Sequence, residues 1–245
     1  MRVAVLSDVH GNVEALRAVL GDVRAAGVDR VVVCGDLTWG PEPAEVARMV
    51  RDLPGAVFVR GNADRAVLEL ADGSREAESA RDEWMVQRHP PDVVAFLSTF
   101  TFSAVLEVPG LGPVRFCHGT PRGDTELVTP ETPVERLAEI AATMPERVLV
   151  SGHTHLRFDR RTDLLRSVNP GSVGLPYHDA GPGLAYWAVL GPDVTLRVSR
   201  YDPAAAAERF RASGIPSTDR YLSLLLDPPS FADIVADAEA RVFSD

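Results

Sequence analysis

Residues 3–12 of the chain read VAVLSDVHGN, an apolar run that ends in a short polar loop before helix-patterned sequence begins. The apolar run predicts a buried β-strand. Alternate side chains of a strand face the same side, so if the extended geometry continues past Leu6, Asp8 and His10 point the same way. A carboxylate and an imidazole that converge are suitable ligands for a metal ion. By itself the triplet also fits a helix-capping Asp beside a surface His, so the rest of the chain must decide.

The arrangement of strand, polar loop and helix recurs along the first part of the chain. Strands are expected at residues 2–7, 30–34 and 56–59, with helices at residues 13–26 and 41–53 between them. Strands that alternate with helices predict a βαβ arrangement and a parallel sheet covered on both faces. The second strand ends at Asp36, and the third ends in a loop that contains Asn62 and Asp64. Each strand therefore brings polar side chains to its carboxyl end.

The rest of the chain predicts a helical cap, a second sheet and a helical tail. Residues 65–98 are charged and helix-patterned, and the apolar runs 102–108 and 113–116 flank a Pro-Gly turn typical of a hairpin. A helix is expected at residues 134–143, and further strands at residues 147–150, 156–161, 165–168, 184–190 and 194–201. We expect the last four of these strands to form the antiparallel edge of the second sheet.

This pattern predicts two structural units. Residues 1–202 form one domain, with residues 65–100 as a helical cap within it, and residues 203–245 form a C-terminal helical tail packed on that domain.

Side chains of metal-ligand type follow the predicted strands in five loops. They are Asp8, His10, Asp36, Asn62, His118, His153 and His155. Ligand-binding groups of open α/β sheets gather at the carboxyl ends of the strands, so these seven side chains can meet. The set contains four of the six histidines of the chain, and histidines scattered at random through a core would not follow strand ends in this way. The sequence therefore predicts a metal site.

The number of ligands predicts two ions. Seven nitrogen and oxygen ligands exceed what one small transition ion accepts, whereas two ions that share a bridging carboxylate use all of them. If the chain is extended there, the Cα atoms of His153 and His155 lie about 6.5 Å apart, which suits one histidine for each of two ions about 3.5–4 Å apart. Two such ions clamp a phosphoryl group and generate a bridging hydroxide. The expected chemistry is hydrolysis of a phosphate ester.

Composition and charge narrow the class of partner. With 245 residues, 45% hydrophobic and 24% charged, the chain is ordinary for a globular protein. A formal net charge of −10 argues against stable binding to nucleic acid phosphates. Cys34 and Cys117 lie in apolar runs, which suggests buried free thiols rather than a disulfide. There is no signal-peptide pattern and no apolar stretch of about 20 residues, so we expect a cytoplasmic protein without a membrane anchor.

In this order, the ligand blocks resemble those of the calcineurin-like metallophosphoesterases, in particular their small bacterial phosphodiesterase branch. The blocks are Asp8-x-His10, Gly35-Asp36, Gly61-Asn62-x-Asp64, His118 and Gly152-His153-x-His155, and the resemblance covers residues 1–201. The resemblance implies a four-layer α/β/β/α sandwich, in which two mixed sheets are flanked by helices. This architecture is compatible with the strand pattern but does not follow from it.

The resemblance also implies a role for each ligand. One ion is held by Asp8, His10 and His155, and the other by Asn62, His118 and His153, while Asp36 bridges the two. Asp36, Asn62 and His118 are therefore expected to be the catalytic residues. The cofactor is two divalent ions, for which Mn²⁺ is favoured and Fe, Co²⁺, Ni²⁺ or Zn²⁺ also suit a ligand set without thiolate. The partner is a small phosphate-ester substrate.

The chain departs from the family at one position. Many members have a histidine after the Gly-Asn pair, where it assists the leaving oxygen, and this chain has Ala63. General acid assistance contributes roughly 10²–10⁴-fold, so its absence predicts a preference for aryl phosphodiesters or nucleotide-type substrates over alkyl monoesters. His89 or His178 could replace the missing acid, although each is expected rather to be a surface or cap residue.

Other residues near the ligands have expected roles. Arg60 and Arg122 are candidates to hold phosphate oxygens, because guanidinium binds phosphate in a bidentate way, or else they pair with nearby carboxylates. Asp64 is expected to orient a ligand histidine. The turn at residues 169–174, NPGSVG, either touches substrate or closes the sheet beneath the site.

Two other functions remain possible for this fold. One is a protein Ser/Thr phosphatase, which the superfamily includes, although no basic groove or peptide-binding insertion is visible in the sequence. The other is a non-catalytic scaffold, since a subunit of the retromer complex has this fold. A scaffold is free to lose ligands, yet all seven positions are filled here.

Overall fold

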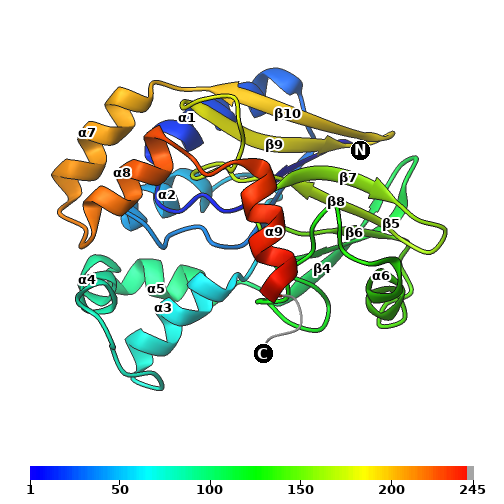
Figure 1. Cartoon of the computed structure of the whole chain (residues 1–245). Helices are drawn as coiled ribbons and strands as arrows, with labels where there is room; N and C mark the ends of the chain where they lie inside the picture. Colours follow the sequence, from blue (N-terminus) through cyan, green and yellow to red (C-terminus); the bar gives the residue numbers. More distant parts are fainter. Residues whose placement is uncertain (242–245) are drawn as a thin grey trace.

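Two five-stranded sheets face each other at the centre of the molecule (Figure 1). The structure is a computed structural model, and it describes residues 1–241. The first sheet has the order β10 (Val194–Arg200), β9 (Leu184–Leu190), β1 (Val3–Leu6), β2 (Arg30–Cys34), β3 (Val57–Val59). The second has the order β4 (Ser103–Val108), β5 (Gly112–Cys117), β6 (Val148–Val150), β8 (Arg166–Pro170), β7 (Arg157–Arg161).

Helices cover the outer faces of both sheets, which confirms the predicted four-layer sandwich (Figure 1). They are α1 (Val13–Ala26), α2 (Pro43–Val50), α3 (Asn62–Asp72), α4 (Ala80–Arg88), α5 (Pro91–Leu97), α6 (Val134–Ala141), α7 (Pro203–Ser213), α8 (Thr218–Leu226) and α9 (Phe231–Arg241). The expected βαβ unit is present, because β1 and β2 pair in parallel with α1 between them. Asn12 caps α1 through its side chain, and Gly27 ends the helix in a left-handed conformation.

The expected position of the last two strands is wrong. Strands β9 and β10 do not extend the second sheet but join the first, where β9 pairs antiparallel with β1. Every residue of β9 is buried: Trp187 faces the helices and Leu190 faces the other sheet. A strand with apolar side chains on both faces is stabilised most in the interior of a sheet, which is where β9 lies.

Because successive side chains of a strand point to opposite faces of its sheet, the core is divided into three layers. In β1, Ala4 and Leu6 pack against the helices of the first sheet, whereas Val3 and Val5 face the second sheet. Phe116 of β5 is fully buried between the two sheets. Both Cys34 and Cys117 are buried and unpaired, as the sequence predicted.

The tail crosses from one outer layer to the other. On α7, Phe210 packs in the helical layer of the first sheet, and on α9, Val235 packs on the outer face of the second. The hydroxyl of Thr132 donates to the Glu239 carboxylate at 2.9 Å, which ties α9 to the loop before α6. The predicted tail extends to residue 245, and residues 242–245 lie outside the described part. Within residues 1–241, no helix combines the length and hydrophobicity needed to cross a bilayer.

The layer between the sheets is expected to dominate stability. Phe116→Ala should lower the free energy of unfolding by about 3–5 kcal/mol. The substitution leaves a cavity between the two packed sheets, and the sheets cannot move together enough to fill it. Val105→Ala on the neighbouring strand is the control: Val105 is 41% exposed, and its truncation should cost less than about 0.5 kcal/mol. Urea unfolding followed by circular dichroism measures both, and equal losses would contradict this account of the core.

Candidate metal centre

The seven predicted ligands come from loops at one end of the two sheets. Asp8 and His10 follow β1, Asp36 follows β2, Asn62 begins α3, His118 follows β5, and His153 and His155 follow β6. Their ligand atoms form two candidate metal-binding groups, one of Asp8, His10 and His155 and one of Asp36, His118 and His153, with the atoms of each group within 4.8 Å of one another.

The sequence-based prediction assumed extended ligand loops. The structure shows instead that these loops are sharply turned. Five of the ligand residues have positive φ angles: Asp8 at 55°, His10 at 47°, Asp36 at 51°, His153 at 66° and His155 at 58°. Ser217 is the other non-glycine residue with positive φ among residues 1–241. The left-handed region costs about 1–2 kcal/mol for a residue with a Cβ, so such residues gather where function requires them. Convergence of the ligands therefore comes from sharp turns after the strands rather than from strand alternation.

Backbone carbonyls fix the tautomers of three ligand histidines. The Nδ1 atom of His10 donates to the Trp39 carbonyl at 3.0 Å, that of His118 to Cys34 at 2.8 Å, and that of His155 to Leu175 at 2.7 Å. In each neutral ring the lone pair is then on Nε2, which points into the site. The same arrangement orients histidines that bind metals in proteins.

The lone pairs converge on the space that a cation would fill. The Nε2 atoms of His10 and His155 lie 3.1 Å apart, and Nε2 of His118 lies 3.2 Å from Nδ1 of His153. When both rings of such a pair are neutral, their facing lone pairs repel each other unless a positive charge, a proton or a metal ion, lies between them. The donor set therefore fits metal ions, and it offers nitrogen and oxygen ligands without thiolate.

Asp36 lies between the two groups. Its Oδ2 is 3.8 Å from Nε2 of His10, and its Oδ1 is 3.4 Å from Nε2 of His118. The side-chain oxygen of Asn62 is 3.0 Å from the same nitrogen of His118. One carboxylate oxygen thus faces each group, which is the geometry that a bridging ligand requires.

The charges of the site are strongly coupled. Burial by itself would raise the pKa of Asp36, but the imidazoles of His118, His10 and His153 together outweigh burial and hold the pKa below the ordinary value. Burial would likewise lower the pKa of His118, yet the charge of Asp36 raises it to about 10. Burial and the neighbouring His118 lower the pKa of His153 to about 4. The pKa shifts of Asp36 and His118 come from the attraction between their opposite charges, whereas that of His153 comes from burial and from the positive charge of His118.

The turn at residues 169–174 holds the first ligand loop from the opposite sheet. The Ser172 hydroxyl donates to the Asp8 carbonyl at 2.7 Å, and the backbone N–H of Val173 donates to the Ser7 carbonyl at 2.9 Å. The buried Asn169 amide donates to the Gly152 carbonyl at 2.7 Å. The turn therefore closes the fold beneath the site, and its own residues do not line the cavity above the ligands.

Two glycines let the ligand loops approach each other. A Cβ atom on Gly61 would lie 2.1 Å from Oδ1 of Asp36, and one on Gly152 would lie 2.6 Å from Oδ2 of Asp8. Any larger residue would displace a ligand carboxylate. These glycines therefore belong to the site although they carry no functional group.

Asp64 positions a loop rather than a histidine. Its carboxylate accepts hydrogen bonds from the backbone N–H groups of Asp36 at 2.8 Å, Leu37 at 3.0 Å and Gly61 at 3.0 Å. Burial raises its pKa to about 7, with the charge of Asp36 as the second cause. Instead of the expected contact with a ligand histidine, Asp64 makes hydrogen bonds to the backbone of the loop that carries Asp36.

The two arginines proposed from the sequence do not line the cavity beside the ligands. Arg122 forms ion pairs with Glu126 and, at 3.4 Å, with Glu139. Of the two roles expected for Arg122, the structure therefore shows the pairing with nearby carboxylates. Arg60 has a buried Nε atom without a hydrogen-bond acceptor in the described chain. His89 is held at both ring nitrogens, by Met85 and Thr38, and neither it nor His178 lines the cavity.

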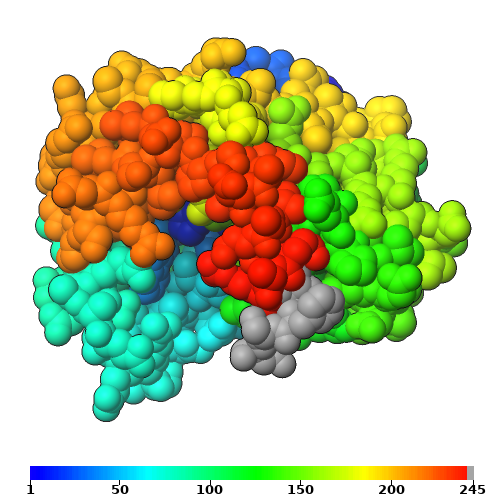
Figure 2. Space-filling view, viewed as in Figure 1, coloured from blue at the N-terminus to red at the C-terminus, as the bar shows by residue number. Residues whose placement is uncertain are grey.

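A cavity of about 230 Å³ opens beside the ligands His10, Asp36, His153 and His155. Its other walls are residues that the sequence did not single out, namely Trp39, Arg81, Leu175, Tyr177, Arg220, Tyr221 and Leu224. Figure 2 shows the hollow between the orange and red helices of the tail, with blue atoms of the N-terminal segment at its base. The ring of Tyr177 stacks on His155, with centroids 5.0 Å apart. The tail thus forms part of the wall of the site.

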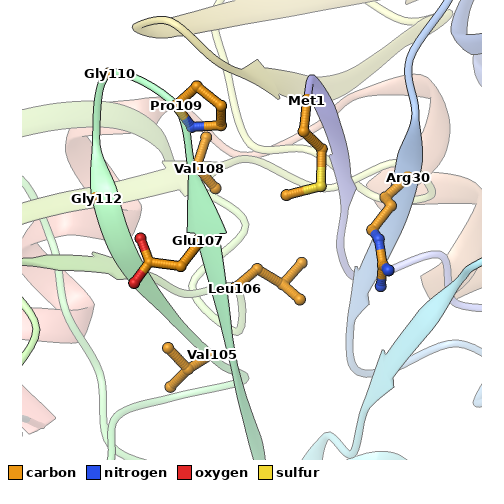
Figure 3. A pocket seen from close by; sticks show the side chains of 9 residues that line it. All are labelled: Met1, Arg30, Val105, Leu106, Glu107, Val108, Pro109, Gly110 and Gly112. Atoms are coloured by element: carbon orange, nitrogen blue, oxygen red, sulfur yellow. The ribbon is translucent and has the colours of Figure 1, made fainter.

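A larger groove of about 570 Å³ lies elsewhere, between the β4–β5 hairpin and the start of the chain. In Figure 3, Met1 and Leu106 point into the gap between the hairpin and β2, while Glu107 points to the other side of its strand. The groove shares no lining residue with the ligand cavity and contains no histidine or cysteine. Size alone therefore does not locate the chemistry of this protein.

Comparison with known proteins agrees with this geometry. Residues 1–190 match the calcineurin-like phosphoesterase superfamily domain. The chain is 27% identical to the phosphodiesterase YfcE of Escherichia coli, over 85% of this chain and 97% of that protein. It is also 27% identical to an uncharacterised protein of Methanocaldococcus jannaschii, over 87% of this chain and 93% of the relative.

Solved structures show the same fold. A metallophosphoesterase from Sphaerobacter thermophilus superposes with a TM-score of 0.74 at 26% identity, covering 92% of this chain and 98% of the other. A hypothetical protein from Pyrococcus horikoshii superposes with a TM-score of 0.79 at 19% identity, covering 94% and 99%. Since the family domain matches most of the sequence and two candidate metal-ligand groups lie at its strand ends, the chain belongs to the calcineurin-like phosphoesterase superfamily.

Proposed function

We propose that this protein is a dinuclear metal-dependent phosphoesterase that hydrolyses phosphodiesters or nucleotide-type phosphate esters. The observation that carries the proposal is the position of Asp36, which presents one carboxylate oxygen to each of two histidine-containing groups. We assign Asp8, His10 and His155 to one ion, and Asn62, His118 and His153 to the other. Mn²⁺ is the proposed metal.

Two divalent ions, when bound, would neutralise phosphoryl oxygens and lower the pKa of water so that hydroxide is available at neutral pH. The chain itself supplies orientation. The carbonyls of Trp39, Cys34 and Leu175 keep three imidazoles in the tautomer that binds a cation. Because these groups are already in place, little reorganisation is needed when the phosphoryl group arrives.

The walls of the cavity favour a small substrate over a phosphoprotein. The cavity is lined in part by α8 and opens between the tail helices α8 and α9 (Figure 2), and its volume of about 230 Å³ is below the usual range of ligand pockets, about 300–1,000 Å³. A folded phosphoprotein would have to pass a phosphoserine between these helices. A protein Ser/Thr phosphatase therefore fits the cavity less well than a phosphodiesterase does. A scaffold without catalysis would not need the oriented imidazoles. The buried free thiols fit our proposal of a reducing, cytoplasmic location.

Replacing the bridging carboxylate should abolish catalysis. Asp36→Asn keeps the shape of the side chain but removes the charge shared by the two groups, so turnover of bis(p-nitrophenyl) phosphate should fall by about 10³-fold or more. Calorimetric titration with Mn²⁺ should show fewer than two bound ions. Asp52→Asn, which alters an exposed carboxylate on another surface, is the control and should behave as wild type. Undiminished turnover in the Asp36 variant would remove this residue from the mechanism.

Metal removal should lower stability. An ion at 100 times its dissociation constant stabilises the folded state by about 2.7 kcal/mol, which for a chain of this size corresponds to roughly 5–10 °C in Tm for each occupied site. We expect the Tm to fall by this amount in excess EDTA and to recover when Mn²⁺ is restored, as measured by differential scanning fluorimetry. A Tm that is the same in both conditions would favour the scaffold.

The leaving group of the substrate should determine the rate of hydrolysis. Ala63 occupies the position at which many family members have a histidine, so kcat/KM should be at least about 100-fold higher for bis(p-nitrophenyl) phosphate than for glycerol phosphate. Ala63→His should narrow this ratio by improving the poorer leaving group. The assay measures initial rates on both substrates at saturating Mn²⁺. Comparable wild-type values on the two substrates would refute the preference.

A further inference from the structure

Two guanidinium groups share the cavity with the metal-binding side chains. Arg81 comes from α4 in the helical cap, and Arg220 comes from α8 in the tail. They come from segments far apart in the sequence, and both line the same cavity as His10 and His155. The cap and the tail therefore each deliver one positive charge beside the phosphoryl site.

Neither guanidinium is neutralised by a carboxylate within residues 1–241. The ion pairs of the described chain involve other arginines, such as Arg65 with Asp124 and Arg166 with Asp159. Arg81 lies 5.6 Å from the ring centroid of Trp39 and hydrogen bonds to Tyr221, while its buried Nε has no acceptor. Arg81 is partly buried and Arg220 is exposed, and both guanidinium groups line one cavity of a chain with a net charge of −10, an arrangement that suits an anionic ligand.

The phosphoryl group under attack does not account for this charge. Two divalent ions beside that group would already neutralise its non-bridging oxygens. A second anionic group on the same substrate would use the arginines. Its nature is indicated by Ala63: with no imidazole there to protonate an alkoxide, the site suits a leaving group that departs as a stable anion. A phosphate monoester, with a second pKa of about 6, is such a group.

We propose that the substrate is a diester of pyrophosphate, such as a nucleoside diphosphate ester, and that Arg81 and Arg220 bind the phosphate that leaves. This proposal rests on the function proposed above and specifies its substrate. Water adds its oxygen to the phosphorus that lies beside the ion positions that Asp36 and the histidines would form, and the bond from that phosphorus to the bridging oxygen breaks. The bridging oxygen leaves with the second phosphorus. The two products are phosphate monoesters, and the protons of the water go to the products or to solvent.

The dimensions of the cavity agree with this assignment. A volume of about 230 Å³ is enough for two linked phosphates but not for a whole dinucleotide. The organic groups would extend through the opening between the tail helices (Figure 2). The aromatic walls formed by Trp39, Tyr177 and Tyr221 offer flat surfaces to a base or sugar at this opening.

The kinetic test compares two substrates in the Mn²⁺-loaded, full-length protein. Wild type and the variants Arg81→Ala and Arg220→Ala are assayed on diadenosine diphosphate and on bis(p-nitrophenyl) phosphate. Each variant should lose about 10- to 100-fold in kcat/KM on the pyrophosphate diester, since a hydrogen bond between charged groups is lost. This loss should exceed the loss on the aryl diester by at least tenfold. Arg→Lys at each position should recover part of it. Arg211→Ala, on the exposed face of α7, is the control and should match wild type.

The binding test does not depend on turnover. Calorimetry measures the affinity of α,β-methylene ADP, which has two phosphates and cannot be cleaved between them. Both alanine variants should bind it about 10-fold or more weakly at 150 mM NaCl while they still bind Mn²⁺ like wild type. Equal losses on both substrates, or unchanged affinity for the analogue, would overturn the assignment. If wild type cleaves neither substrate, the proposed hydrolase function fails, and the affinities still decide whether the arginines bind a diphosphate.

Discussion

Hydrogen bonds between the ligand loops are the constraint on which the site depends. The N–H of Asp8 donates to the Gly35 carbonyl and that of His10 to the Asp36 carbonyl, each at 3.0 Å, so the first two loops hold each other. At the end of the second sheet, the N–H of Gly152 donates to the His118 carbonyl at 2.8 Å. These bonds keep ligand residues in left-handed conformations that an isolated loop would leave.

The same network explains why charge can be concentrated at this point. Asp8, Asp36 and Asp64 are all buried near one another, which is unfavourable unless each has partners. Asp64 accepts three backbone N–H groups, while Asp8 and Asp36 face imidazoles. The fold thus stabilises a group of hydrogen-bond acceptors and carboxylates that still lack cationic partners. A centre of this kind, once it binds cations, can polarise a phosphate ester.

The additions to the sandwich form part of the wall beside this centre. The cap and the tail are helical segments without recognisable motifs, yet they form the walls of the cavity with Arg81 and Arg220. The loops at the ends of the sheets carry the candidate ligands, and we propose that these helices select among phosphate esters. Relatives with the same ligands and other helices can therefore differ in substrate.

The sequence by itself determined the ligand types, their order and their place after predicted strands, because a strand and its terminal residues are encoded locally in a few neighbouring positions. It also suggested that Cys34 and Cys117 are buried free thiols, and the tertiary structure decided against a bridge between them. The sequence did not place β9 in the first sheet, since pairing with β1 joins residues far apart in the chain. Nor did it reveal the left-handed turns at the ligands, the grip of Asp64 on the Asp36 loop or the two arginines of the cavity. Each of these depends on contacts between distant segments, so only the tertiary structure could decide them.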